Sequence, residues 1–517
     1  MPDASQDSNL PDQRVHFTRG ATYLIMQNVS INALSVVSFV ILARLISPKE
    51  MGIWAVLQLI IAIASTFVTW YPQAVTKFVA ENISKGLLSP AAAAFYQALR
   101  ANVIVYIPAI IGFYLGAPFL ASHLLGDVSY APLFRVVAFD VFLNAGMLQL
   151  LVAALLGLQM FRETAVIGFL VNGLFRQMLI ISLILLMKNF FGLVVGWLIS
   201  DAATVIIYLI LTVRVLGKPR FDFSLSRLTR FYLPLEVAQI VAFAQTWFDR
   251  AFLVLFVSLA TLGIYNAALT AFSVLGGISG AMTNMLLPAY SSIRGTDNRV
   301  SMRHSISLGI RYANFTLTPL AFGLLATAKP AITLFVGQAY VSGALPLTIF
   351  ALAFAVTAFT TPLGPVFLAL EATIAAASIF AVSVLIGLAA AFVLLPIGGI
   401  VGVSIARALA IISPAVLQVL ILRKKITLDL DVNTIAKTFI AGTVMAVALL
   451  GVQLIYYNKF MLPAYILLGG AVYLLMLRSL KAVSLDDMNL LRSFLGKKLS
   501  LVCIIITWLL GLDRLSS

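Results

Sequence analysis

The stretch AVSVLIGLAAAFVLLPIGGIVGVSIARALAIISPAVLQVLIL, residues 381–422, contains one charged side chain, Arg407. A helix needs about 20 apolar residues to cross the hydrocarbon of a bilayer, so this stretch is long enough for two crossings. Over the whole chain of 517 residues, 62% are hydrophobic and 10% are charged, whereas soluble domains carry about 25% charged residues. A transmembrane β-barrel would show short alternating segments instead. The composition therefore predicts an all-α, polytopic membrane protein.

Fourteen apolar stretches of comparable length follow one another along the chain. They lie at about residues 20–43, 51–72, 98–121, 131–158, 164–187, 190–213, 230–258, 262–288, 306–328, 344–369, 373–396, 398–422, 435–456 and 460–478. We therefore expect a cytoplasmic tail over 1–19, a six-helix lobe over 20–213, a basic cytoplasmic linker over 214–229, a second six-helix lobe over 230–422, a linker with two further transmembrane helices over 423–478, and a cytoplasmic or interfacial tail over 479–517.

The distribution of Lys and Arg predicts the topology. The net charge of +15 comes from 34 Lys and Arg against 19 Asp and Glu, and in membrane proteins Lys and Arg accumulate on the cytoplasmic side. With a cytoplasmic N-terminus, the cytoplasmic segments hold 25 of these 34 residues and the outer loops hold 6. Both termini are therefore expected in the cytoplasm. The apolar run at 501–512 has only 12 residues, so we expect it to lie at the interface rather than to span the membrane.

A short repeat relates the two halves of the chain. SPKEMGIWAVLQ at 47–58 aligns without a gap with SLATLGIYNAAL at 258–269, at an offset of 211 residues. Six predicted spans separate the two copies, so the repeats enter the membrane in the same direction. This predicts two parallel six-helix lobes with a central cavity between them. Arg44, just before the first copy, belongs either to a tight outer hairpin or to a phosphate contact at the mouth of the cavity.

The segments around these repeats resemble a known family. GATYLIMQNVSINALSVVSFVILARLISPKEMGIWAVL at 20–57 and FDRAFLVLFVSLATLGIYNAAL at 248–269 resemble the Wzx-type polysaccharide exporters of the multidrug/oligosaccharidyl-lipid/polysaccharide (MOP) flippase superfamily. The resemblance implies a cell-membrane flippase that moves a polyprenyl-linked oligosaccharide from the cytoplasmic to the outer leaflet. It also implies glycan polymerases or glycosyltransferases as partners. The matching motif positions are Arg44, Gly52, Asp249, Gly263 and Tyr265.

Three arginines lie within predicted spans: Arg176, Arg250 and Arg407. An ionisable group at the bilayer centre costs about 2.5–3.5 kcal/mol on insertion scales, so each needs a partner, water or a function. A lipid-linked sugar carries a phosphate or diphosphate, which a guanidinium binds through two parallel hydrogen bonds without losing its own proton. These arginines are our candidates for phosphate contacts, and a purely structural role is the alternative for each.

Polar side chains also recur at helical spacing. Glu236, Gln239, Thr246 and Arg250 share one face of the seventh span with Phe243, and Asn28 and Asn32 form a shorter stripe in the first span. Such faces are unsuited to lipid, so they face either a neighbouring helix or a hydrated cavity for the sugars. Asp249, on an adjacent face, is expected to hold helices together.

Two other functions compete with the flippase. A cation-coupled drug antiporter would need carboxylates in the cavity, for which Asp140, Asp201 and Asp249 are available. A membrane-embedded glycosyltransferase would need acidic residues on a large outer loop, and the outer loops are short. The sequence has one cysteine, three separated histidines and no glycine-rich phosphate loop, so we expect no enzyme, metal, cofactor or nucleic-acid partner. A non-transporting scaffold is a third reading.

Overall fold

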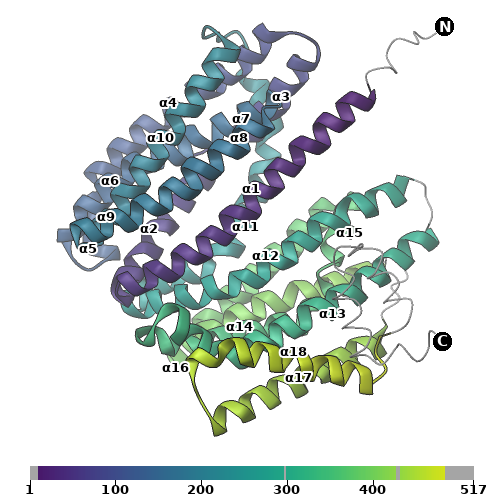
Figure 1. Ribbon diagram of the computed structural model, residues 1–517. Helices are drawn as coiled ribbons and strands as arrows, with labels where there is room; N and C mark the ends of the chain where they lie inside the picture. The colour runs from purple at the N-terminus through teal and green to yellow at the C-terminus, as the bar shows by residue number, and fades with distance from the viewer. Residues whose placement is uncertain (1–9, 296–298, 425, 427–430, 484–517) are drawn as a thin grey trace. The chain divides into compact units, whose positions relative to one another are not determined.

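The computed structural model describes residues 10–295, 299–424, 426 and 431–483, with side chains from residue 22 onward except at 295 and 299, and this part of the chain is built from helices and turns without strands (Figure 1). The predicted interfacial segment at 501–512 and most of the predicted C-terminal tail lie outside these residues.

The helices of the first half run as follows: α1 Leu10–Leu45, α2 Pro48–Phe67, α3 Pro72–Ser84, α4 Leu88–Leu115, α5 Ala117–Leu124, η2 Val128–Tyr130, α6 Ala131–Val141, η3 Phe142–Leu148, α7 Gln149–Gly157, α8 Phe161–Ile167, η4 Gly168–Phe175, α9 Arg176–Met187 and α10 Phe191–Leu216. The second half contains α11 Leu225–Phe256, α12 Leu259–Gly295, α13 Arg299–Ala331, η5 Ile332–Val336, η6 Gln338–Gly343, α14 Ala344–Thr357, η7 Ala358–Thr360, α15 Leu363–Ala369, α16 Thr373–Leu422, α17 Val432–Ile455, η8 Lys459–Met461 and α18 Leu462–Ser479. The segments η3, η4 and η5 are π-helical turns.

The number of membrane crossings agrees with the sequence prediction. Twelve helical segments in the described residues are long and apolar enough to cross a membrane. One of them, α16, breaks at Gly399, whose φ of 52° and ψ of −131° are not helical, and therefore supplies two crossings. The helix α11 coincides with the predicted seventh span. It is not counted among the twelve apolar segments because the polar residues along it lower its hydropathy. The all-α polytopic fold with about fourteen transmembrane helices is confirmed.

The chain divides into two compact units. The first comprises residues 1–243 with 258–263, and the second comprises 244–257 with 264–517. In the first unit, the core lies among α3, α4, α7 and α10 and includes Phe78, Phe95 and Tyr208. In the second unit, α13 packs against α17 and α18 around Phe322, Met445 and Tyr465, and α17 and α18 lie side by side at the yellow end of the colour scale (Figure 1).

The start of α2 explains part of the repeated motif. The backbone N–H of Ser47 donates to Glu50 Oε2 at 2.7 Å, and the N–H of Glu50 donates to Ser47 Oγ at 3.3 Å. This capping box, with Pro48 in the first turn, fixes where the helix begins.

The two glycines paired by the repeat lie in contact within the first unit. A methyl group on Gly52 would stand 1.8 Å from the carbonyl oxygen of Leu259, and one on Gly263 would stand 2.0 Å from that of Pro48. Only glycine allows the starts of α2 and α12 to approach this closely.

Candidate functional site

The first candidate site is a charged cluster within the first unit, centred on Asp201 of α10. Arg176 lies 3.3 Å from Asp201 between Nη1 and Oδ1, and Asp201 is fully buried. Asn144 donates to Asp201 Oδ2 at 2.9 Å and Asn172 donates to Oδ1 at 3.3 Å. Arg176 Nη1 also donates to the side-chain oxygen of Asn172 at 3.0 Å. The carboxylate is therefore surrounded by donors from three different segments.

Two π-helical turns place these donors. Asn144 lies in η3 and Asn172 in η4, and Arg176 follows η4 directly. A π-helical turn inserts one extra residue into a helix and redirects the side chains that follow, and such turns are frequent at functional sites. The irregular backbone here is therefore part of how the cluster is assembled.

Asp140 of α6 completes this cluster. Its side chain is fully buried, and neither of its carboxyl oxygens receives a hydrogen bond from a donor among the described residues. It interacts electrostatically with both Asp201 and Arg176. The cluster thus contains two carboxyl groups and one guanidinium.

The second candidate site lies within the second unit and has the opposite balance. Asp249 of α11 is fully buried, and Arg407 of α16 approaches it at 3.7 Å and Arg250 at 4.0 Å. Tyr265 of α12 donates its hydroxyl to Asp249 Oδ2 at 2.7 Å. Arg407 Nη1 also donates to the carbonyl oxygen of Gln245 at 2.6 Å. One carboxylate therefore forms ion pairs with two guanidinium groups.

Aromatic rings support the arginines of both clusters. The guanidinium of Arg250 lies 3.6 Å from the ring centre of Trp247, and that of Arg176 lies 5.5 Å from the ring of Trp197. The Nε atoms of Arg176, Arg250 and Arg407 are buried and have no hydrogen-bond partner among the described residues. In Arg176 the ion pair uses the Nη atoms and leaves Nε as spare donor capacity, whereas in Arg250 and Arg407 Nε is the atom that faces Asp249, at a distance too long for a hydrogen bond.

The remaining predicted site residues lie elsewhere. Asn28 and Asn32 are exposed on α1, and Gln239 and Thr246 are exposed on α11. Glu236 accepts a hydrogen bond from Tyr232 within the first unit. Arg44 is exposed at the end of α1 and has an interaction with another residue. Within the second unit, the carbonyl oxygen of Thr246 accepts a hydrogen bond from Arg250 at 2.8 Å, so Thr246 borders the second cluster.

Several members of the clusters were not predicted as site residues. Asn144 and Trp247 have no distinguishing sequence signal, and their roles depend on which helices become neighbours. Asp140 and Asp201 were recognised as ionisable residues within spans, but nothing in the sequence paired them with Arg176. In the described part of the chain, no group of three or more His, Cys, Asp or Glu side chains is arranged to hold a metal ion.

Comparison with known proteins identifies the family. A family model described as "Polysaccharide biosynthesis protein" matches residues 41–344, which is more than half of the chain. The chain belongs to this polysaccharide biosynthesis family. No curated protein matches the sequence. The matched range contains both copies of the repeated motif and both Arg176 and Asp249, so the family resemblance predicted from the sequence is confirmed.

Solved structures show the same fold. The lipid II flippase MurJ in an inward closed conformation superposes with a TM-score of 0.67 at 14% identity, covering 87% of this chain and 98% of that one. An inward-facing multidrug resistance MATE family transporter of the MOP superfamily superposes with a TM-score of 0.61 at 15% identity, covering 77% of this chain and 94% of that one. A mutant of the Vibrio cholerae MATE transporter VcmN superposes with a TM-score of 0.56 at 15% identity, covering 81% of this chain and 98% of that one. This member of the polysaccharide biosynthesis family therefore has the fold of the MOP superfamily.

Proposed function

We propose that this protein is a flippase that moves a polyprenyl-phosphate- or polyprenyl-diphosphate-linked oligosaccharide or polysaccharide precursor from the cytoplasmic to the outer leaflet of the cell membrane. The observation that carries the proposal is the family match over residues 41–344, on a fold shared with MurJ. In this proposal the protein is a transporter and catalyses no covalent step. Glycan polymerases or glycosyltransferases would supply or consume its cargo.

We assign the phosphate contacts first to Arg250 and Arg407. The two guanidinium groups share one carboxylate, Asp249, so their cluster carries a surplus positive charge that an anionic group would balance. Charge-assisted, bidentate hydrogen bonds from arginine to phosphate are stronger than neutral ones. Arg176 has the same chemistry, but the carboxyl groups of Asp201 and Asp140 already face it, and it is a weaker candidate.

The exposed polar side chains supply the second part of the proposal. Asn28 and Asn32 on α1 and Gln239 and Thr246 on α11 offer hydrogen-bond groups to sugar hydroxyls, with Glu236 beside them on α11 and Arg44 at the end of α1. The glycan would pass through a hydrated path while its polyprenyl chain stays in lipid, and alternating access of the two lobes would expose the site to each side in turn.

A transport assay tests this function. The purified chain is reconstituted into proteoliposomes with a fluorescent polyprenyl-diphosphate oligosaccharide, and the fraction in the outer leaflet is followed with a membrane-impermeant quencher. We expect protein-dependent transbilayer movement that liposomes without protein do not show. No movement with folded, inserted protein would refute the proposal.

One observation favours a second candidate, a cation-coupled multidrug antiporter. The buried pair Asp140 and Asp201 has one more carboxyl group than the nearby arginine can balance, and a proton or sodium ion taken up there could be exchanged for a cationic drug. Efflux measurements on the same proteoliposomes, loaded with a fluorescent lipophilic cation, decide between the flippase and the antiporter. Efflux of the cation driven by a proton or sodium gradient, without movement of the lipid-linked sugar, would favour the antiporter.

A further inference from the structure

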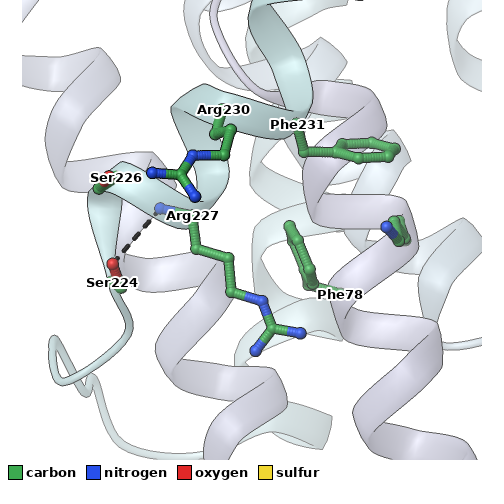
Figure 2. A pocket seen from close by; sticks show the side chains of 7 residues that line it. Phe78, Ser224, Ser226, Arg227, Arg230 and Phe231 are labelled. Carbon is green, nitrogen blue, oxygen red and sulfur yellow. Dashed lines mark hydrogen bonds between the residues drawn. The ribbon is translucent and has the colours of Figure 1, made fainter.

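A pocket in the first unit lies away from both charged clusters. It has a volume of about 470 Å³ and lies between α3 and the start of α11. Lys77 and Phe78 line it from α3, and Ser226, Arg227, Arg230 and Phe231 line it from α11. Figure 2 shows Arg227 and Arg230 leaving the first turns of α11, with the ring of Phe78 beside the Arg227 side chain. Three cationic side chains thus surround one hollow.

Contacts of α11 with α3 and with the turn before α3 fix the walls of the pocket. The hydroxyl groups of Tyr71 and Thr229 lie 3.1 Å apart, and Tyr232 donates its hydroxyl to the carbonyl oxygen of Thr69 at 2.9 Å. The rings of Phe78 and Phe231 pack edge to face at 5.7 Å. Because these contacts hold α3 against α11, the pocket needs little rearrangement before it can receive a ligand.

The positive charge in the pocket is largely uncompensated. Arg227 lies 3.7 Å from Glu81, but Glu81 is already held by Lys85 at 2.8 Å. Among the ion pairs of the described residues, none involves Lys77 or Arg230. The hydrogen bond and charge of Lys85, with the charges of Arg227 and Lys77, hold the pKa of Glu81 below its usual value. Glu81 therefore stays ionised, but because it is shared with Lys85 it does not balance the three cations of the pocket.

The aromatic rings position the cations rather than neutralise them. Lys77 Nζ lies 4.1 Å from the ring centre of Phe231, and the Arg227 guanidinium lies 4.7 Å from that of Phe78. Ser224 Oγ accepts from the backbone N–H of Arg227 at 3.3 Å and so caps the start of α11. The N-terminus of this long helix lies at the pocket and adds a partial positive charge from the helix dipole. Ammonium, guanidinium, hydroxyl and helix terminus together form a receptor suited to an oxyanion.

The position in the chain indicates the source of that oxyanion. Lys77 and the residues from 224 to 231 belong to segments that the charge distribution places at the cytoplasmic surface, next to the ends of spans. Basic pockets between transmembrane helices at this level bind the phosphate head groups of anionic lipids. We propose that this pocket binds the phosphate or diphosphate head of a membrane lipid in the cytoplasmic leaflet. The lipid is either the polyprenyl carrier of the proposed cargo or an anionic phospholipid.

Binding to the full-length protein tests the proposal without any transport step. Native mass spectrometry of the detergent-purified chain measures binding of farnesyl diphosphate and of phosphatidylglycerol. We compare the native chain with Lys77→Gln/Arg230→Gln and with the control Lys218→Gln/Arg220→Gln, which removes the same charge from the basic link outside the pocket. We expect the pocket variant to bind at least one of the two lipids about tenfold or more weakly, and the control to bind as the native chain does.

The two lipids separate the two sources. A loss confined to farnesyl diphosphate assigns the pocket to the polyprenyl carrier, and a loss for both lipids assigns it to anionic head groups in general. Equal binding by all three proteins, or an equal loss in the control, would overturn the proposal. If the double variant does not fold, Arg230→Gln alone gives the same test, since this side chain is exposed. Because no flipping is measured, failure here and failure of the proposed flippase are distinguishable.

Discussion

The two units of the molecule contain charged clusters with similar components and opposite charge balance. The first has one arginine, Arg176, with the carboxyl groups of Asp201 and Asp140. The second has one carboxylate, Asp249, with two arginines, Arg250 and Arg407. Because uncompensated charge is expensive inside a membrane, each surplus calls for a ligand of the opposite sign. In the proposed function, the surplus positive charge of the second cluster would be balanced by the phosphate of the cargo, and the surplus carboxyl group of the first by a proton or a cation.

The supporting groups differ as well. In the first cluster, amide side chains from the π-helical turns η3 and η4 donate to Asp201. In the second, the hydroxyl of Tyr265 donates to Asp249, and Arg250 lies on the face of Trp247. The motif copies that hold Trp54 and Tyr265 therefore contribute unequally: Tyr265 contacts the second cluster directly, whereas Trp54 contacts Trp197, the ring beside Arg176.

The largest effect is expected from removing the only carboxylate of the second cluster. Asp249→Asn leaves two partly buried guanidinium groups without their carboxylate partner, and removing one partner of a buried ion pair costs about 3–5 kcal/mol. We expect a large fall in the thermal unfolding midpoint of the purified protein. The double variant Asp249→Asn/Arg407→Gln restores the native surplus of one positive charge and should recover part of the loss. Equal stability of Asp249→Asn and the native protein would show that the charges are not coupled.

A smaller effect is expected in the first cluster, because it contains a spare carboxyl group. Asp201→Asn loses charge-assisted hydrogen bonds worth about 1.5–3 kcal/mol, but Asp140 remains near Arg176. Asp140→Asn removes the surplus carboxyl and should leave the unfolding midpoint unchanged or raise it. Both substitutions change the volume equally, so each is the control for the other. A larger loss for Asp140→Asn than for Asp201→Asn would contradict the charge balance that we assign.

The smallest effect concerns the extra donor of the second cluster. Tyr265→Phe removes one hydroxyl that donates to Asp249 and should cost about 1.5 kcal/mol, the lower end of the range for a hydrogen bond to a charged group, because both arginines stay beside the carboxylate. Tyr290→Phe is a matched control, because Tyr290 is also fully buried in the second unit and its hydroxyl has no hydrogen-bond partner among the described residues. We expect the control to unfold at the native midpoint or above it in the same thermal assay. Identical losses in the two variants would mean that the hydroxyl does not stabilise the cluster.

The sequence was sufficient to predict the global fold for a simple physical reason. Membrane crossing requires a long apolar helix, so the fourteen stretches are readable from composition alone, although the break predicted between 396 and 398 lies at Gly399 in the structure. The repeated motif at 47–58 is also a local feature of the sequence, and the structure shows that its Ser47 and Pro48 start α2 and that its Gly52 allows close packing. The parallel arrangement of the lobes and the central cavity remain predictions.

The candidate sites were only partly predictable. Arg176, Arg250 and Arg407 stand out because a charge in an apolar span is costly, yet their partners depend on tertiary neighbours: Arg407 and Asp249 are far apart in sequence and on different helices. The expectation that Asp249 holds helices together fits its central position. From the sequence, the cations of the α3–α11 pocket predict only which side of the membrane their segments lie on. Nothing in the sequence places Lys77 beside Arg227 and Arg230.

The most direct test of the central claim is the flipping rate of Arg250→Gln beside that of Arg176→Gln, in proteoliposomes matched for folded protein. If the phosphate is bound by the arginine-rich cluster of the second unit, Arg250→Gln loses a charge-assisted contact worth about 1.5–3 kcal/mol. Flipping of the fluorescent polyprenyl-diphosphate oligosaccharide should then slow about tenfold or more, while Arg176→Gln stays within about threefold of the native rate. A native rate for Arg250→Gln together with a tenfold loss for Arg176→Gln would contradict the account and move the phosphate to the first cluster.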